Sequence, residues 1–279
     1  MGRTAERAGG GADRYELYEL CVQDAAGMAA FLAAVHGGRP RVMREDFCGG
    51  GAVCRAWVGG GGGRSGGAGK AGAGRRAIAV DLDPRALERL SGVRGLRAVA
   101  ADVMDCDLNA DIISATNFPI GYWHTRRELM AYLKKSRARL NRGGVFVCDT
   151  YGGPTAMRPG RTKRSVPAGG GRRVDYTWEQ RSADPLTGLV VDVLHFQVFR
   201  GGKLEAEVPE AFTYSWRLWS IAELREAIAE AGFRASEVYT SLADAVDGEG
   251  NVHVRPVREP EDVGAGGRRD YVAYIAARA

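Results

Sequence analysis

Residues 41–52 constrain the fold of this 279-residue chain more than any other stretch. A short apolar run that starts at Val42 reaches an acid, Glu45, and the glycines 49–51 follow almost at once. Glycines at a corner between a strand and a helix allow a tight turn and let a ligand approach main-chain N–H groups. The stretch therefore predicts a strand, a ligand-binding turn and a helix over 52–58. Such turns bind several classes of nucleotide and phosphate, so the spacing of residues further along the chain is needed to distinguish between these ligands.

Short apolar runs alternate with helical segments through the first 150 residues. A first helix is expected over 13–35, and Thr125 and Glu128 have the spacing of a capping box for another that runs to about 140. Acids end the second and third of the expected strands, at Asp81 and Asp102. The five expected strands are 42–47, 77–80, 96–100, 111–115 and 145–149. This alternation predicts a parallel, doubly wound sheet with right-handed crossovers.

The pattern changes in the second half of the chain. Three alternating runs rich in β-branched and aromatic residues, 174–182, 189–200 and 203–216, are joined by turn signals and predict an antiparallel meander. Ser220 and Glu223 form another capping-box pattern, for a helix that ends near 231. Two further strands are expected at 233–239 and 271–277.

From Asp13 to the C-terminus the chain resembles the class I S-adenosylmethionine (SAM)-dependent methyltransferases. Within them it is similar to an uncharacterised group with an Arg-Glu-Asp-Phe-Cys-Gly first motif, here residues 44–49, and a Tyr-Gly-Gly segment after strand five, here residues 151–153. The resemblance implies an α/β fold: a Rossmann-like seven-stranded sheet with helices on both faces and an antiparallel meander inserted after strand five. It also implies SAM as the cofactor and a methyltransferase (EC 2.1.1) as the activity.

Composition and the resemblance together predict the division of the chain. Residues 1–12 are expected to form a disordered tail, and 13–279 the methyltransferase domain. Within that domain, 59–74 is a flexible insertion of glycine, alanine, serine and basic residues, whose composition offers too little apolar burial to offset its ordering entropy. The meander, 174–216, is expected to form a cap over the substrate.

The resemblance also assigns roles in cofactor binding. Glu45 would hold the methionine ammonium, the glycines would pass under the cofactor, Asp81 would take the ribose hydroxyls and Asp102 would face the adenine amino group. Asp83 already stands at the cap position of the next helix, which leaves Asp81 for a ligand. The expected cofactor-binding set is Glu45, Phe47, Gly49, Gly51, Asp81, Leu82, Asp102, Val103 and Asn117.

Two of these residues carry qualifications. Phe47 stands where the superfamily usually has its first glycine, so its backbone is expected to keep φ negative and to route the cofactor slightly differently. Asn117, in the loop after strand four, has two readings that stay open: a ligand contact, or hydrogen bonds that only satisfy the loop backbone.

The methyl acceptor is expected to meet aromatic side chains over the carboxyl ends of the strands. Because transfer of an activated methyl needs mainly positioning, no dedicated base is required, and the candidates for a catalytic role are Tyr18, Asn117 and Tyr151. The expected acceptor pocket consists of Tyr15, Tyr18, Tyr122, Trp123, Tyr151, Trp216 and Arg217.

Composition limits the other classes of function. The net charge of +5 permits contact with nucleic acid, but no basic run is dense enough to indicate it. The four histidines lack metal-ligand spacing, so no metal site is expected. No apolar run approaches the roughly 20 residues that span a bilayer. Five irregularly spaced cysteines are expected to be reduced core thiols, which favours an intracellular, cytoplasmic protein with organellar targeting left open.

Three functions compete on this basis. The first is a methyltransferase of a small molecule, because no RNA-binding module is attached to the chain. The second is a methyltransferase of protein or RNA, which the basic balance allows. The third is a SAM-binding scaffold or assembly factor without catalysis, which the Phe47 departure suggests. The identity of the acceptor and the oligomeric state stay open.

Overall fold

The computed structural model describes residues 12–59, 74–259 and 270–279. The chain forms two compact units. One comprises Met1–Gln23 and Met157–Arg217, and the other comprises Asp24–Ala156 and Leu218–Ala279. The predicted tail, 1–12, and the predicted glycine-rich insertion, 59–74, lie outside the described residues except at their ends, so both stay predictions.

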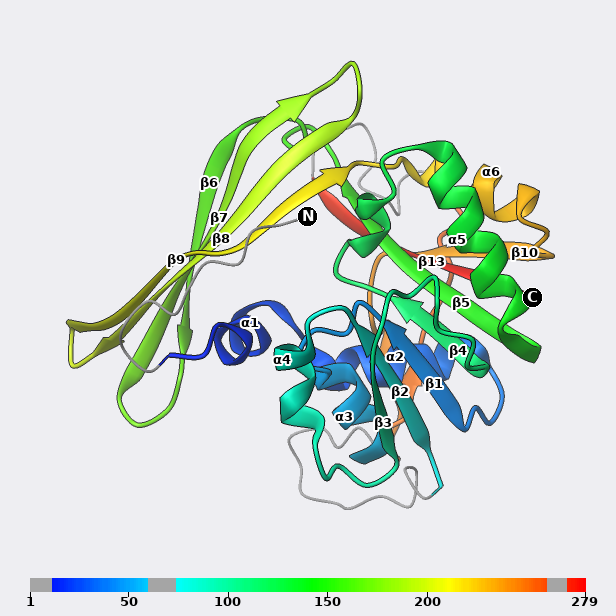
Figure 1. Ribbon diagram of the computed structural model, residues 1–279, viewed down its shortest axis with the longest axis horizontal. Helices are drawn as coiled ribbons and strands as arrows, with labels where there is room; N and C mark the ends of the chain where they lie inside the picture. The colour runs from blue at the N-terminus through cyan, green and yellow to red at the C-terminus, as the bar shows by residue number, and fades with distance from the viewer. Residues whose placement is uncertain (1–11, 60–73, 260–269) are drawn as a thin grey trace. The chain divides into compact units, whose positions relative to one another are not determined.

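The larger unit is built on a seven-stranded sheet with the order β10-β13-β5-β4-β1-β2-β3 (Figure 1). Its parallel strands are β1 (Val42–Asp46), β2 (Arg76–Asp81), β3 (Leu96–Ala100), β4 (Ala110–Ala115) and β5 (Leu140–Gly152). The strand β13 (Tyr271–Arg278) runs antiparallel to both β5 and β10 (Ala235–Tyr239). The predicted fold class, a mostly parallel seven-stranded sheet with an antiparallel sheet added, is confirmed.

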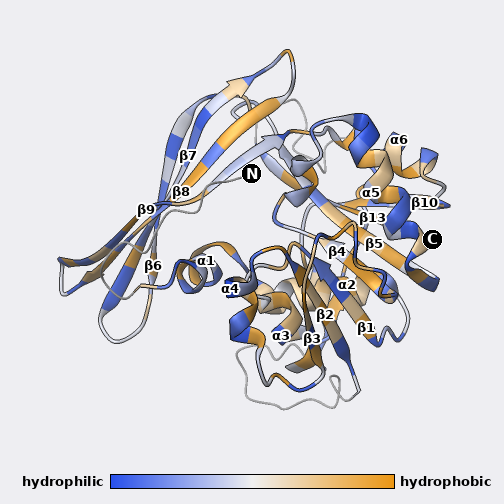
Figure 2. Cartoon of the chain, viewed as in Figure 1, coloured by the Kyte–Doolittle hydropathy of each residue, from blue (hydrophilic) through white to orange (hydrophobic). Residues whose placement is uncertain are grey.

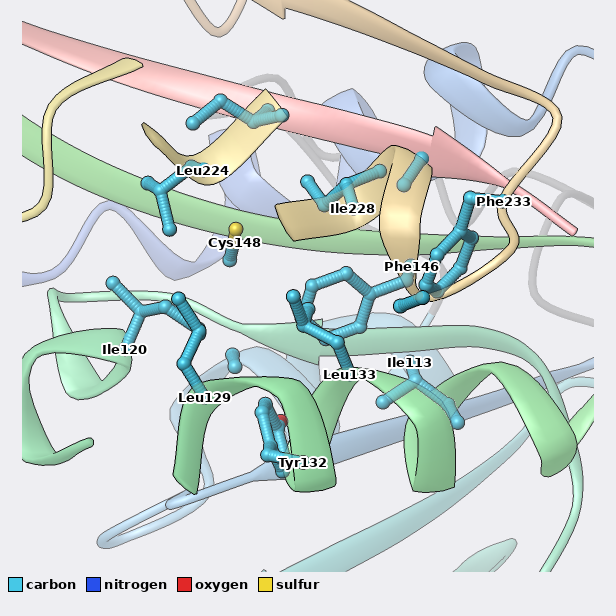
Figure 3. Close-up of a cluster of buried hydrophobic side chains, with 14 of the residues drawn as sticks. Ile113, Ile120, Leu129, Tyr132, Leu133, Phe146, Cys148, Leu224, Ile228 and Phe233 are labelled. Atoms are coloured by element: carbon cyan, nitrogen blue, oxygen red, sulfur yellow. The ribbon is translucent and has the colours of Figure 1, made fainter. Parts of the chain in front are cut away.

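Helices cover both faces of this sheet (Figure 1). Because successive strand residues point to opposite faces, Ile112 and Val145 pack against α2 (Ala25–His36) and α3 (Ala52–Gly59). Their neighbours in sequence pack against α5 (Arg126–Ala138) and α6 (Ile221–Glu230). Figure 3 shows this second layer, in which Leu129 and Leu133 of α5, Phe146 of β5 and Ile228 of α6 belong to one buried cluster. The short α4 (Pro84–Leu87) and the 3-10 helices η2 (Glu88–Leu90) and η3 (Pro119–Tyr122) fill connections.

The capping boxes predicted at Thr125 and Ser220 are present and fix the starts of helices. Thr125 and Glu128 exchange side-chain and backbone hydrogen bonds at the start of α5, and Ser220 and Glu223 do the same at the start of α6. The single helix predicted over 13–35 is wrong. The chain instead forms α1 (Arg14–Val22) and α2, because the Asp24 carboxyl accepts the Gly27 N–H at 2.9 Å and starts a new helix.

The smaller unit contains a four-stranded antiparallel meander with the order β6-β7-β8-β9. Its strands are β6 (Gly160–Pro167), β7 (Arg172–Asp184), β8 (Leu189–Arg200) and β9 (Lys203–Arg217). The three predicted runs correspond to β7, β8 and β9, with turns where they were expected. The strand β6 was not predicted, because it is an exposed polar edge whose residues do not alternate (Figure 2).

One face of the meander is apolar and packs against α1. Leu17 and Cys21 of the helix join Tyr176, Leu194 and Phe196 of the strands in one cluster. Figure 2 shows the apolar residues of β8 as the hydrophobic centre of this sheet. The helix and the meander therefore form one unit although more than a hundred residues separate them in the sequence.

Further predictions concern the whole chain. All five cysteines are buried and free, as expected. Within the described ranges, no group of three or more histidine, cysteine or acidic residues is arranged to hold a metal ion. No single helix among the described residues is long and apolar enough to cross a membrane, although α1 and α2 taken together, across their bent break, meet the criteria of length and composition.

Candidate functional site

The candidate site lies where the strand order of the larger unit reverses. The strands β2 and β3 lie on one side of β1, and β4 and β5 on the other. In open α/β sheets, ligands bind at the carboxyl ends of the strands at such a reversal. All nine residues of the expected cofactor-binding set lie at or just beyond the carboxyl ends of β1 to β4.

The turn after β1 has an unusual backbone. Phe47, Gly49 and Gly51 have φ angles of 59°, 52° and 65°, so each is in the left-handed region. The expectation that Phe47 keeps φ negative is therefore wrong. Its backbone takes the conformation that a glycine would take, and its ring packs near Tyr122, Trp123 and Tyr132, with centroids 5.7, 6.2 and 6.1 Å away. These ring contacts offset the cost of a side chain in this region.

Glycine is needed at two positions of the turn, Gly49 and Gly51, on different structural grounds. A Cβ on Gly51 would lie 2.7 Å from the Leu90 side chain, so Gly51 permits close packing. A Cβ on Gly49 would meet nothing within 4 Å, so this side of the turn is open to a ligand. The Cys48 N–H donates to the Val80 carbonyl at 3.0 Å, which fixes the turn to the end of β2.

The left-handed backbone at Phe47 predicts an unusual order of stability for its glycine and alanine variants. Alanine and glycine at position 47 both remove the ring, but only glycine relieves the left-handed backbone. We expect Phe47→Gly to be more stable than Phe47→Ala by about 1 kcal/mol. Urea unfolding followed by circular dichroism measures the difference. At the neighbouring Cys48, which lacks a positive φ, the alanine variant should be more stable than the glycine variant. If the glycine variant is the more stable one at both positions, the positive φ of Phe47 is not the cause.

Asp81 holds the glycine turn at the end of β2. Its Oδ2 accepts the Gly49 N–H at 2.8 Å, and its Oδ1 accepts the Asp83 N–H at 2.9 Å. Asp83 caps α4, as predicted, by accepting the Arg85 N–H at 3.0 Å. Each carboxylate oxygen of Asp81 has a second lone pair, so the side chain can accept further hydrogen bonds from a ligand. Burial raises the pKa of Asp81.

Glu45 is buried beneath the same turn, with 2% of its surface exposed. Its Oε2 accepts the Cys54 N–H at 3.2 Å, in the first turn of α3. Burial raises the pKa of Glu45 to about 7, and the nearby Asp81 carboxylate adds to this shift. The contact that the structure shows for Glu45 is therefore with α3, and its contact with a ligand ammonium stays a prediction.

Three further members of the expected cofactor-binding set, Leu82, Asp102 and Val103, follow β2 and β3. The Asp102 Oδ1 accepts the Met104 N–H at 2.8 Å and so closes the turn that leaves β3. Val103 beside it is buried, whereas Leu82, directly after Asp81, has 69% of its surface exposed. An exposed leucine at the carboxyl end of a strand suits contact with the flat face of a base.

The loop after β4 depends on a residue that the sequence analysis missed. Asn117 and Phe118 both have φ angles of 70°. Their N–H groups donate to Asp149 Oδ2 and Oδ1 at 2.8 and 2.7 Å. Asp149 lies in β5, is 2% exposed, and has a pKa that burial raises to about 7. An acid that ends an apolar run such as 145–148 was the only sequence signal for it.

The acceptor candidates divide between the two units. Tyr122, Trp123 and Tyr151 belong to the larger unit, and the Tyr151 ring packs edge-on against Phe118 at 4.9 Å. Tyr15 and Tyr18 pack on Phe212 in the smaller unit, at 5.5 and 5.3 Å. The other two members of the smaller unit are Trp216, which stacks on Tyr214 at 4.3 Å, and Arg217. A pocket common to all seven residues therefore stays a prediction.

Comparison with known protein families and with curated protein sequences finds no match. Among solved structures, the chain is similar to DesVI from Streptomyces venezuelae, at 16% identity and a TM-score of 0.66 over 95% of this chain and 97% of that one. It is also similar to the sugar N-methyltransferase KedS8 from Streptoalloteichus, at 18% identity and 0.64 over 100% and 98%.

A third structure shares the fold. CalS10, an amino pentose methyltransferase from Micromonospora echinaspora solved with bound SAM, has 17% identity and a TM-score of 0.61 over 98% of this chain and 100% of that one. The chain therefore has the fold of SAM-dependent methyltransferases over its full length.

Proposed function

We propose that the chain is a SAM-dependent methyltransferase that transfers a methyl group to a small-molecule acceptor. One observation carries the proposal. Three acids, Glu45, Asp81 and Asp102, stand at the carboxyl ends of the adjacent strands β1, β2 and β3, around a turn with positive φ at Phe47, Gly49 and Gly51. The shared fold and the small-molecule methyltransferases among its structural neighbours support it.

The chemistry of these residues suits SAM. Carboxylates match its ammonium, its ribose hydroxyls and its adenine amino group, each of which donates hydrogen bonds. The open side of Gly49 allows a close approach to the turn. The carboxylates Glu45 and Asp81 also favour a ligand that carries positive charge at its ammonium and sulfonium groups.

The bound cofactor would supply a methyl group activated by the sulfonium. The protein then has to hold the acceptor lone pair in line with the methyl carbon at about 3 Å and exclude water. Tyr151 would orient the acceptor, because its ring is itself held by Phe118 in the loop that Asp149 anchors. The acceptor atom loses its proton to solvent, so no residue has to act as a base when the acceptor arrives neutral.

The first test is cofactor binding. Calorimetry should show binding of SAM and of its product S-adenosylhomocysteine (SAH), with no comparable affinity for NAD. Asp81→Asn keeps the shape of the side chain but removes its charge and one of its two acceptor oxygens, and should cost about 1.5–3 kcal/mol, or about 10- to 150-fold in Kd.

The matched control is Asp83→Asn two residues away. Asparagine caps helices as well as aspartate does, so this variant should bind SAH like the wild type. Equal affinities of the Asp81 variant and the wild type would overturn the site assignment.

The second test is turnover. A screen of amines, alcohols and thiols for SAH release should find an acceptor among small molecules. Release with protein or RNA alone would favour a macromolecular substrate instead. Tight SAH binding without release from any acceptor would favour the non-catalytic scaffold.

A further inference from the structure

Arg44 occupies a position where a charge is unexpected. It lies within β1, next to Met43, and its register partners in the neighbouring strands are Ile78 and Ile113. Strands covered on both faces normally consist of apolar residues. Only 1% of Arg44 is exposed. A guanidinium buried to this extent needs hydrogen-bond partners for its donors, and those partners indicate what it does.

The partners of Arg44 form a closed network. Its Nε donates to Asp46 Oδ1 at 2.6 Å. Its Nη1 donates to the carbonyls of Cys106 and Leu108, at 2.8 and 3.4 Å, and its Nη2 donates to the Val103 carbonyl at 2.9 Å. The Tyr132 hydroxyl donates to the other Asp46 oxygen at 2.9 Å. The buried charge is thus paired, and three of its bonds go to one stretch of backbone.

That stretch is the crossover from β3 to β4. Residues 101–109 carry the chain from the edge strand past β2 and β1. Parallel strands usually need a crossover of roughly a dozen residues or more, most often a helix whose carbonyls are satisfied internally. This crossover contains no helix, and Val103 and Cys106 are buried in the cluster on the α5 face of the sheet. Arg44 supplies the donors that a helix would have supplied.

The same crossover begins with two members of the expected cofactor-binding set, of which Asp102 is expected at the adenine. Asp102 stands at its start, and the carbonyl that Arg44 Nη2 binds belongs to the next residue, Val103. On the other side, Lys135 Nζ of α5 donates to the Met104 carbonyl at 2.6 Å. Carbonyls of 103, 104, 106 and 108 are therefore held by cations, and this fixes where the Asp102 carboxylate can point.

We propose that Arg44 is a positioning residue for adenine recognition, which holds the helix-free crossover so that Asp102 faces the base. The inference rests on the proposed function. Asp46 accepts the Arg44 Nε–H and so joins the crossover to the turn that starts at Phe47. One buried cation thus ties the adenine end of the cofactor site to the glycine turn.

The test compares two conservative variants in the full chain. Arg44→Lys can keep the ion pair with Asp46, but its single nitrogen cannot also reach three carbonyls. We expect its Kd for SAH to rise at least tenfold. The ratio of its affinities for SAH and for the inosine analogue of SAH, which has an oxygen in place of the adenine amino group, should fall toward one. Asp102→Asn should cost much less affinity in this background than in the wild type.

The matched control is Tyr132→Phe. It removes a buried hydrogen bond from the same Asp46 but leaves the bonds of Arg44 to the crossover carbonyls in place. It should lose stability while its SAH affinity and its discrimination between the two ligands stay within about threefold of the wild type. If Tyr132→Phe loses discrimination as fully as Arg44→Lys, or if a folded Arg44→Lys keeps it, the proposal is wrong.

Hydrogen exchange separates this proposal from the proposed function. Without any ligand, amides of 101–109 should exchange faster in Arg44→Lys than in Tyr132→Phe, and equal rates would refute the anchoring. Failure of the wild type to bind SAH would refute the proposed function and, with it, the adenine role. If Arg44→Lys does not fold, Lys135→Met is the alternative variant, because it loosens the same crossover at a partly exposed site. It should also lower the discrimination between SAH and its inosine analogue. Unchanged discrimination in this variant would overturn the proposal.

Discussion

Replacing Asp149 by alanine is expected to lower the free energy of unfolding by roughly 3–5 kcal/mol at pH 6. The buried Asp149 carboxyl would no longer accept the N–H groups of Asn117 and Phe118, which would both lose their acceptors at once. Each unsatisfied group costs about 1–3 kcal/mol, and both residues keep left-handed backbones that only surrounding contacts maintain. Urea unfolding followed by circular dichroism measures the loss.

Asp111 provides a matched control for this prediction. Its Oδ2 also accepts two backbone N–H groups, of Arg41 and Val42, at 2.7 and 2.9 Å. Asp111 itself is only partly buried, whereas Asp149 is 2% exposed, so water can replace the Asp111 carboxylate. Asp111→Ala should therefore lose clearly less stability than Asp149→Ala, and an equal loss would show that burial is not the cause.

The effect of Asp149 should also depend on pH. Its folded pKa, about 7, lies above the ordinary value of 3.8, so between these values the folded chain binds a proton that the unfolded chain releases. The stability that Asp149 contributes is therefore largest at low pH and decreases as the pH rises from about 4 to 7. The deficit of Asp149→Ala should be smaller at pH 8 than at pH 5, by about 1 kcal/mol or more. Glu45, whose pKa is raised likewise, is present in both proteins and cancels in the comparison.

The sequence predicted the parallel strands well because each is a short apolar run with a clear end. It predicted β3 at the residues where the structure has it, 96–100. It missed β6, because an edge strand exposed on both faces has no pattern of burial to reveal it. It also ran α1 and α2 together, since a cap formed by Asp24 differs little in sequence from an acid on a helix surface.

The site was predicted less completely than the fold. Acids at strand ends are visible in a sequence, and Asp81 and Asp102 do lie at the carboxyl ends of neighbouring strands. Nothing in the sequence indicated the residues whose contacts position the site. Tyr132 and Asp46 are 86 positions apart, and Arg44 reaches carbonyls about 60 positions away. No local pattern shows which distant backbone a buried polar side chain will meet.

Tyr151 should affect methyl transfer through its ring and not through its hydroxyl. The ring packs against Phe118, which Asp149 anchors, so it offers a fixed surface for an acceptor. Tyr151→Phe keeps this surface and should retain activity within roughly tenfold, whereas Tyr151→Ala removes it and should lose on the order of a hundredfold. Single-turnover rates with an acceptor identified by SAH release give the measurement. Tyr18, whose ring packs on Phe212, is compared in the same way.

The pH dependence of the same rates decides between positioning and proton transfer. If Tyr151 only positions the acceptor, the wild type and Tyr151→Phe should have pH profiles of the same shape, because neither the ring nor its packing titrates. If the hydroxyl removes the acceptor proton, Tyr151→Phe should be as inactive as Tyr151→Ala and should lose a pH-dependent step. Affinity for SAH, measured in parallel, should be unchanged in both variants, since Tyr151 is expected at the acceptor and not at the cofactor. A Phe variant that binds SAH normally but is as inactive as the Ala variant would make Tyr151 the base and overturn the positioning account.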